Sequence, residues 1–258
     1  MPNSPTSTAE ISANCLTCGR SFRTAEVRLY GHTFVADRYC EFCREAEIVL
    51  DDERRAELRW GQAEVPPLYR RCSFANFDRV EGTERALGVA RQWTKEFRTG
   101  TKVRRGLGFY GPPGAGKTHL AVAILREAAW SERASRCLFL NVPEWLNAIR
   151  ESWNSSKSEP PPTPEGYEIV LLDDLGAEYW SDWARDRIYS LVNHREQEGS
   201  LTFLTSNCSA GELVRRVGRP SASRLGRLCA EVELEPKRDY REVLVERDPA
   251  QRNDEEAA

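Results

Sequence analysis

The stretch GPPGAGKT, residues 111–118, fits the pattern G-x-x-x-x-G-K-[ST] at every fixed position. It follows a short apolar run, GLGFY, and precedes an amphipathic stretch, THLAVAILREAAW. The sequence therefore predicts a strand, a tight loop and a helix. Glycines let such a loop turn its backbone N–H groups towards one point, and the start of the helix adds positive charge there. The arrangement predicts a binding site for the phosphates of a nucleotide.

We expect the whole loop and the residue after it to contact the nucleotide: Gly111, Pro112, Pro113, Gly114, Ala115, Gly116, Lys117, Thr118 and His119. Lys117 is expected to reach the β- and γ-phosphates, and the Thr118 hydroxyl to ligate Mg²⁺. A glycine-rich turn without a ligand is the alternative. The strand before the loop and the helix after it argue against that alternative.

Acidic and amide side chains follow two further apolar runs. IVLL, at residues 169–172, ends in Asp173 and Asp174, and LTFLTS ends in Asn207. Continuous apolar runs predict strands buried on both faces of a parallel sheet, and open sheets bind ligands at the carboxyl ends of their strands. We expect Asp173 to hold Mg²⁺, Asp174 to orient or deprotonate the attacking water, and Asn207 to contact that water or the γ-phosphate. An acidic turn and an ordinary turn asparagine are the alternatives.

The same strands alternate with helical patterns along the chain. Further segments are CLFLNV, a strand, then PEWLNAIRESW and DWARDRIYSLVNHREQEG, both helices. This alternation predicts an α/β fold with a parallel central sheet. Upstream, residues 44–60 are charged and compatible with a connecting helix, and Pro66 and Pro67 mark its end.

Four of the eight cysteines form two close pairs, Cys15 with Cys18 and Cys40 with Cys43. The spacing C-x2-C-x21-C-x2-C is typical of a structural zinc site with four thiolate ligands, which has no open position for catalysis. With four thiolates present, His32, expected with Gly31 at the tip of a hairpin between the pairs, is not needed as a ligand. A thiol–disulfide pair and unrelated free cysteines are the alternatives. The remaining cysteines occur singly and are expected to be small buried side chains: Cys72, Cys137, Cys208 and Cys229.

Composition narrows the class of protein further. No apolar run is long enough to span a bilayer, and the N-terminus lacks the features of a secretory signal, so we expect a cytoplasmic protein without membrane contact. In a reducing compartment a disulfide scaffold is not expected. The formal net charge of −3 does not exclude nucleic acid, because a local basic surface can act within a balanced total.

Four segments occur in the order GPPGAGKTHLAVAI, VLLDDLG, LTFLTSN and SASRLGRL. With the upstream PPLYRRCSFANFD they resemble the DnaC/IstB branch of the AAA+ ATPases, which contains helicase loaders and transposase helper ATPases. The resemblance covers roughly residues 65–245. It implies ATP as the nucleotide, hydrolysis of ATP to ADP and phosphate, a parallel sheet without a large helical lid, and an entry segment beside the adenine.

Site residues can be carried over from the resemblance one by one. Lys117 and Thr118 match the Walker A residues, Asp173 and Asp174 match Walker B, and Asn207 matches sensor 1. Arg224, in SRL, matches the arginine finger that reaches the γ-phosphate bound to a neighbouring subunit, which implies self-association. Arg241, in DYR, resembles the sensor 2 arginine. A solvated basic face is the alternative for any arginine of this segment.

The resemblance also implies partners. The leading interpretation is a DnaC-like loader that recruits a hexameric replicative helicase to single-stranded DNA, with the zinc unit as the partner-binding module. Arg150, Trp153 and Lys157 are available for single-stranded DNA. The alternatives are an IstB-like transposition helper, a nucleotide-binding zinc scaffold with little hydrolysis, and a small-molecule kinase. The acidic pair, Asn207 and Arg224 argue against the kinase.

We therefore expect five regions along the chain, with a disordered arm and a disordered acidic tail at the ends: 1–12 the arm, 13–45 the zinc-ribbon module, 46–65 a helical linker, 66–245 the AAA+ ATPase domain and 246–258 the tail.

Overall fold

A computed structural model of the chain describes residues 9–15, 18–29, 32–35, 37, 40–101, 103–131, 133–134, 136–154, 161, 163–177 and 181–240. The chain divides into two compact units, residues 1–55 and 56–258. The division falls inside helix α1 (Glu41–Gly61), which accounts for the connecting helix expected over residues 44–60. None of the described helices is both long and apolar enough to cross a membrane.

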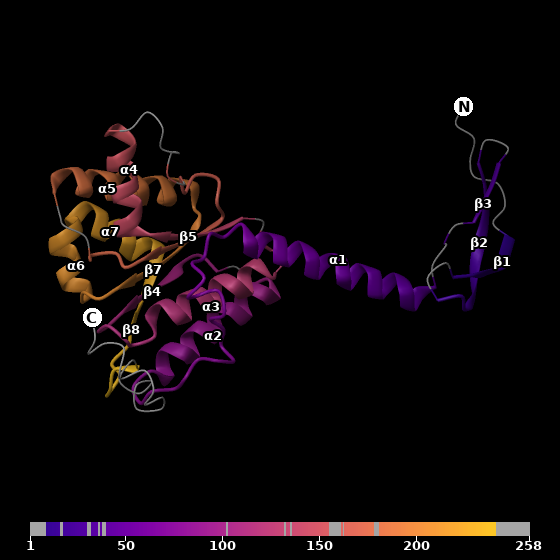
Figure 1. Cartoon of the computed structure of the whole chain (residues 1–258), viewed down its shortest axis with the longest axis horizontal. Helices are drawn as coiled ribbons and strands as arrows, with labels where there is room; N and C mark the ends of the chain where they lie inside the picture. Colours follow the sequence, from indigo (N-terminus) through magenta and orange to yellow (C-terminus); the bar gives the residue numbers. More distant parts are fainter. Residues whose placement is uncertain are drawn as a thin grey trace, which may run out of the picture. The chain divides into compact units, whose positions relative to one another are not determined.

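The smaller unit contains an antiparallel sheet of three strands in the order β1-β2-β3 (Figure 1). The strands are β1 (Ala9–Asn14), β2 (Ser21–Leu29) and β3 (His32–Val35). Residues 9–12, expected in a disordered arm, instead pair with β2, with Ala9 opposite Glu26. The prediction of a hairpin between the cysteine pairs is confirmed, but His32 lies in β3 opposite Leu29 rather than at the tip. Gly31 and residues 1–8 lie outside the described residues.

The larger unit contains a parallel sheet of five strands in the order β5-β6-β7-β4-β8. The strands are β4 (Gly106–Tyr110), β5 (Cys137–Asn141), β6 (Ile169–Asp173), β7 (Leu201–Ser206) and β8 (Cys229–Glu233). The first four are the apolar runs predicted from the sequence. The edge strand β8 was not anticipated from the sequence.

Helices cover both faces of this sheet (Figure 1). They are α2 (Glu84–Thr99), α3 (Lys117–Ala129), α4 (Val142–Asn154), α5 (Asp182–Glu198), α6 (Ala210–Val217) and α7 (Arg219–Leu228). The helices α3, α4 and α5 were predicted, whereas α2, α6 and α7 were not. The described residues end at Tyr240, and between β8 and that residue no helical lid is present.

Alternate residues of each strand face opposite layers, and this produces two cores. Phe109 and Phe203 pack with α2 and α3 on one face, whereas Tyr110 and Leu204 pack with α4 to α7 on the other. Because both faces are covered, β4 to β7 are buried along nearly their whole length, which explains their mainly apolar runs. The sheet thereby holds the carboxyl ends of β4, β6 and β7 at one edge.

Gly106, at the start of β4, provides a test of how closely the strands pack. A Cβ atom there would lie 1.8 Å from the carbonyl oxygen of Thr202, which is backbone and cannot move aside. We expect Gly106→Ala to lower the free energy of unfolding by about 1–3 kcal/mol or more. Gly88→Ala, on α2 with nothing within 4 Å, is the control and should raise it by about 0.5–1 kcal/mol. Urea denaturation followed by circular dichroism measures both, and equal effects would contradict the prediction.

Candidate nucleotide-binding and metal sites

The loop of residues 111–116 connects β4 to α3 and turns through left-handed backbone at Gly114 (φ 73°) and Gly116 (φ 85°), where glycine is favoured. The Lys117 side chain folds back over this loop. Its Nζ lies 2.9 Å from the carbonyl oxygen of Gly111 and 2.7 Å from that of Pro112, and the side chain is buried. The loop thus has the shape expected of a phosphate cradle, with an ammonium group inside it.

Asp173 joins the loop to the sheet. The Thr118 hydroxyl donates a hydrogen bond of 2.9 Å to Asp173 Oδ1, and the Thr205 hydroxyl donates one of 2.7 Å to the same oxygen. Burial raises the pKa of the Asp173 carboxyl to about 6. The two groups expected to hold Mg²⁺ are therefore in contact, and their oxygen atoms are the ligand type that Mg²⁺ prefers. Thr205, the second residue that donates to Asp173 Oδ1, was not anticipated from the sequence.

Asp174 and Asn207 lie together at the ends of β6 and β7, as expected. The Asn207 amide donates to Asp174 Oδ1 over 3.3 Å, and the Asp174 backbone N–H donates to the Thr205 hydroxyl over 2.9 Å. Asp174 has a φ of 57°, in the left-handed region that residues other than glycine adopt only at a cost in free energy. Thr205 therefore fixes the backbone of Asp174, and Asn207 orients its carboxylate.

His119 contacts the segment that precedes α2 rather than the loop itself. Its Nε2 lies 2.9 Å from the Ser73 carbonyl oxygen, and its ring meets the Phe77 ring edge-on at 5.2 Å. Burial lowers the pKa of His119. A cavity of about 60 Å³ lies beside Gly116. Its lining comes from the segment before α2, from the phosphate loop with the start of α3, and from the last described residue: Phe77, Asp78, Val80, Thr83, Ala115, Gly116, His119 and Tyr240. The segment expected to lie beside the adenine thus supplies Phe77 and Asp78 to a cavity next to the phosphate loop.

The last described residues run along the phosphate loop. The Tyr240 backbone N–H donates to the Gly114 carbonyl oxygen over 3.3 Å, and the Tyr240 hydroxyl donates to Asp78 Oδ2 over 3.3 Å. A Cβ atom at Gly114 would lie 1.6 Å from Asp239 Oδ1, so the Asp239 carboxylate packs directly on the loop. This approach gives a second reason for glycine at position 114. Arg241, the expected sensor 2 residue, lies outside the described residues.

Arg224, on α7, makes contacts within its own chain. Its guanidinium donates to Asn193 Oδ1 over 3.1 Å and to the Tyr189 hydroxyl over 3.2 Å, and its Nε lies 3.3 Å from Glu196 Oε2. Arg227 pairs with the same Glu196 carboxylate. Arg224 is thus held against α5, and contact with a neighbouring subunit would require it to exchange these partners.

An aromatic and basic cluster joins α4 to α5. The Arg150 guanidinium lies 5.0 Å from the centre of the Trp183 ring, and the Trp153 ring meets Trp183 edge-on at 5.4 Å. Trp153 is 62% exposed. The structure therefore brings together two of the three residues considered for single-stranded DNA and adds Trp183, whereas Lys157 lies outside the described residues.

The paired cysteines converge on one point. Their four Sγ atoms lie within 4.8 Å of one another, and the Sγ atoms of Cys18 and Cys40 are 3.7 Å apart. A tetrahedral zinc site with Zn–S bonds of about 2.3 Å requires sulfur atoms about 3.8 Å apart, so the cluster fits zinc. A hydrogen bond with Cys18 is the main cause that raises the pKa of the Cys43 thiol to about 12, so a metal ion bound by this thiolate would displace a proton. The second pair flanks the start of α1 rather than lying in a loop.

The four single cysteines are buried, as predicted: Cys72, Cys137, Cys208 and Cys229.

The order of strands defines the class of protein. The strand that ends in Asn207 lies between the strand that leads to the phosphate loop and the strand that ends in the acidic pair. Together with the phosphate loop, this order of strands is that of a P-loop NTPase. The model of the family of IstB-like ATP binding proteins matches residues 41–224, and the chain belongs to that family.

Individual relatives are replication proteins. The chain is 27% identical over 183 residues to the replicative helicase loader DnaC of Escherichia coli strain K12, which covers 68% of this chain and 73% of DnaC. It is 35% identical over 115 residues to the replicative helicase loader DnaI of Bacillus subtilis strain 168, which covers 42% of this chain and 35% of DnaI. A crystal structure of the DnaC helicase loader has a TM-score of 0.58 at 24% identity, covers 66% of this chain and 100% of that one, and shows the fold alone.

Thr205 provides a test of the contact at Asp173. Thr205→Val removes a donor to Asp173 and an acceptor for the Asp174 N–H, so we expect a loss of about 1–3 kcal/mol in unfolding free energy. Mg²⁺-dependent binding of a fluorescent ATP analogue should weaken as well. Thr205→Ser keeps the hydroxyl and is the matched control. Equal binding by the two variants would contradict a role for this hydroxyl.

The cysteine cluster predicts that the purified protein contains a stoichiometric amount of zinc, measured by mass spectrometry of the metal. Cys15→Ser should remove most of it, because a site with three thiolates is incomplete. Cys72→Ser, at a buried cysteine outside the cluster, is the control and should leave the zinc content unchanged. Zinc retained at full occupancy in Cys15→Ser would show that the metal binds elsewhere.

Proposed function

We propose that the chain binds ATP with Mg²⁺ and hydrolyses it. The observation that carries this proposal is the contact of Thr118 with Asp173 beside the Lys117 ammonium, because these groups suit a metal ion and the phosphates it accompanies. Mg²⁺, when bound, neutralises charge on the phosphates. Lys117 binds the β- and γ-phosphates, and Thr118 and Asp173 hold the metal.

The hydrolytic step is assigned to the Asp174 carboxylate. It accepts a hydrogen bond from the Asn207 amide, so its orientation is set before a water molecule arrives. Asp174 orients that water or accepts its proton, and Asn207 contacts the water or the γ-phosphate. Positioning by side chains already held in place lowers the entropic part of the barrier.

We infer that the machine served by this ATPase is a replicative helicase, as in a DnaC-type loader. The names of the relatives from Escherichia coli and Bacillus subtilis support this inference, and so does the presence of a separate zinc-binding unit that can recognise a partner. In this proposal the zinc unit binds the hexameric helicase. Arg150, Trp153 and Trp183 contact the single-stranded DNA to which the helicase is recruited.

Self-association through Arg224 would make hydrolysis depend on assembly. Glu196 and Tyr189 hold Arg224 inside the free chain, and in an assembly a neighbour's γ-phosphate replaces Glu196 as its anionic partner. Arg227 would keep Glu196 paired after Arg224 leaves, so the carboxylate is not left without a cation. The complete ATPase site would then lie at the interface between two copies of the chain.

A second candidate, in the same ATPase family, is an IstB-like transposition helper acting on duplex DNA. The match to the IstB-like family model supports it. Retention of a transposase rather than a helicase in a pull-down, with ATP turnover stimulated by duplex DNA alone, would favour this second candidate.

Three substitutions test the assignment of the ATPase residues. Asp174→Asn should retain ATP binding and lower turnover by about 10²-fold or more. Lys117→Ala should weaken ATP binding itself. Arg224→Ala should leave ATP binding unchanged but remove the rise in specific activity with protein concentration. A native chain that binds ATP but shows no turnover above that of Lys117→Ala would leave a nucleotide-binding scaffold as the function.

Partner recognition is tested with the purified full-length chain and the replicative helicase of the same host. Cys15→Ser combined with Cys40→Ser should abolish retention of the helicase while ATP binding persists. Helicase binding by the doubly substituted chain would show that the cysteines serve only the fold of their own unit. Failure of the native chain to retain any helicase would contradict the loader.

A further inference from the structure

A groove on the outer side of α2 has no role in the nucleotide site. It has a volume of about 490 Å³ and is lined by Phe74, Arg91, Thr94, Lys95, Arg98 and Thr99. Volumes of this size are typical of ligand sites. It shares no lining residue with the cavity beside the phosphate loop, so it is a separate feature of the surface.

The cations of the groove follow from helical spacing. Arg91, Lys95 and Arg98 are separated by four and three residues, which places them on one face of α2. Arg91 and Arg98 are about 10 Å apart along the helix axis. All three side chains are exposed, although the chain as a whole carries a formal net charge of −3. The groove therefore concentrates positive charge on an otherwise acidic protein.

Most of this charge is not neutralised by the protein. Lys95 has no hydrogen-bond or ion-pair partner for its ammonium group among the described residues. Arg91 donates to the Phe74 carbonyl oxygen over 3.0 Å through one of its nitrogens, which fixes the side chain and leaves its other donors available. Arg98 pairs with Glu127, on α3, over 2.8 Å. Three cations thus face one carboxylate.

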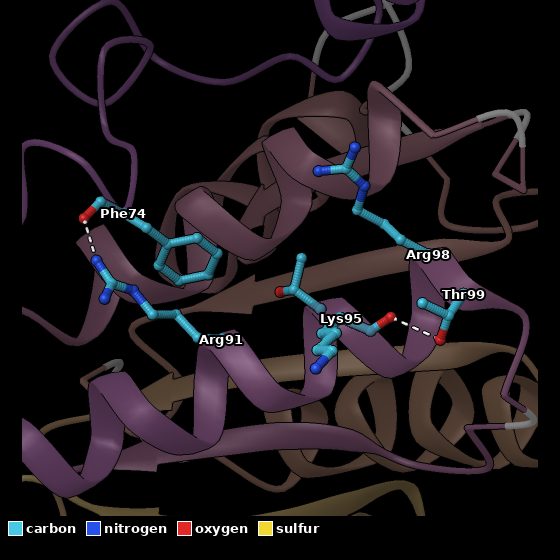
Figure 2. Close-up of a pocket in the computed structure, with 6 residues that line it drawn as sticks. Phe74, Arg91, Lys95, Arg98 and Thr99 are labelled. Carbon is cyan, nitrogen blue, oxygen red and sulfur yellow. Dashed lines mark hydrogen bonds between the residues drawn. The ribbon is translucent and has the colours of Figure 1, made fainter.

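Phe74 adds an aromatic surface between the cations. Figure 2 shows its ring between the side chains of Arg91 and Arg98, which lie at opposite ends of the groove. Thr94 and Thr99 donate their hydroxyl protons to carbonyl oxygens of α2, so these two residues add no anionic group to the lining. The Phe74 ring is partly buried against the core, so only part of it faces the groove. Cations along a groove with an accessible aromatic face between them suit single-stranded nucleic acid, since phosphates bind the cations and a base stacks on the ring.

We propose that this groove binds a short segment of single-stranded nucleic acid, with its phosphates on Arg91, Lys95 and Arg98 and a base on Phe74. The site goes beyond the proposed function, because it is separate from the phosphate loop and from the α4–α5 cluster of Arg150, Trp153 and Trp183. An acidic peptide would satisfy the cations but leave the Phe74 ring without a planar partner. A duplex keeps its bases stacked inside and would not reach the ring.

The test uses the full-length protein and a fluorescently labelled oligothymidine of about 16 nucleotides, followed by anisotropy without ATP or helicase. Lys95→Glu should weaken binding about tenfold or more, and Lys95→Ala should lower the slope of log K against log salt by about 0.7. Arg215→Glu is the matched control: it makes a comparable charge change at an exposed arginine of α6, away from the α4–α5 cluster, that makes no hydrogen bond or ion pair among the described residues. It should bind nearly as the native chain does.

Two further variants distinguish a defined binding site from nonspecific electrostatic attraction of the nucleic acid. Glu127→Gln releases Arg98 and should strengthen binding about two- to fivefold. Phe74→Leu should weaken it about five- to tenfold without changing the salt slope. If Phe74→Leu fails to fold, by circular dichroism, the Lys95 and Glu127 variants still decide the question.

The proposal is overturned if Lys95→Glu binds like the native chain, if Arg215→Glu loses as much affinity as Lys95→Glu, or if an equally long duplex or polyglutamate binds more tightly. The double variant Lys95→Glu with Trp153→Ala distinguishes this groove from the α4–α5 cluster. If the two sites are separate, its loss of binding free energy should equal the sum of the losses of the two single variants. None of these measurements depends on helicase loading, so the groove and the proposed function can fail independently.

Discussion

The Asp173 carboxylate joins three elements of the larger unit. It ends β6 and accepts hydrogen bonds from Thr118 at the start of α3 and from Thr205 near the end of β7. A buried carboxylate costs free energy unless polar partners surround it, and the pKa of about 6 expresses that cost. Binding of a cation between these oxygens would relieve it. The residue that organises the edge of the sheet is thus also the residue best placed to hold the metal.

The strand order turns this local contact into a site. Since β7 lies between β4 and β6, its last residues face the phosphate loop on one side and the acidic pair on the other. Thr205 contacts both acidic residues, and Ser206 accepts the Gly111 N–H through its carbonyl oxygen. A change in this strand end would therefore be transmitted to the loop and to Asp174 together.

The smaller unit depends on a different kind of interaction. Among the described residues of this unit, the buried apolar cluster consists of Cys15, Cys40 and Cys43, with Phe22 packed against them. A unit of this size would gain more stability from a bound metal than from its small core. Zinc would hold the strands and the first turn of α1 together without contributing to catalysis, which suits a recognition module.

Local sequence alone determined the phosphate loop, four strands of the parallel sheet, the helices between them and the cysteine spacing. These features follow from periodicity, glycine positions and motifs that act over a few residues. Tertiary structure decided the rest. Several contacts join residues that are distant in the chain. Thr205 bonds to Asp173, Asp239 packs on Gly114, and Arg224 pairs with Glu196. The buried Arg195 likewise donates to the carbonyl oxygens of Tyr167 and Leu201. Such contacts depend on strand order and helix packing, and no local pattern encodes them.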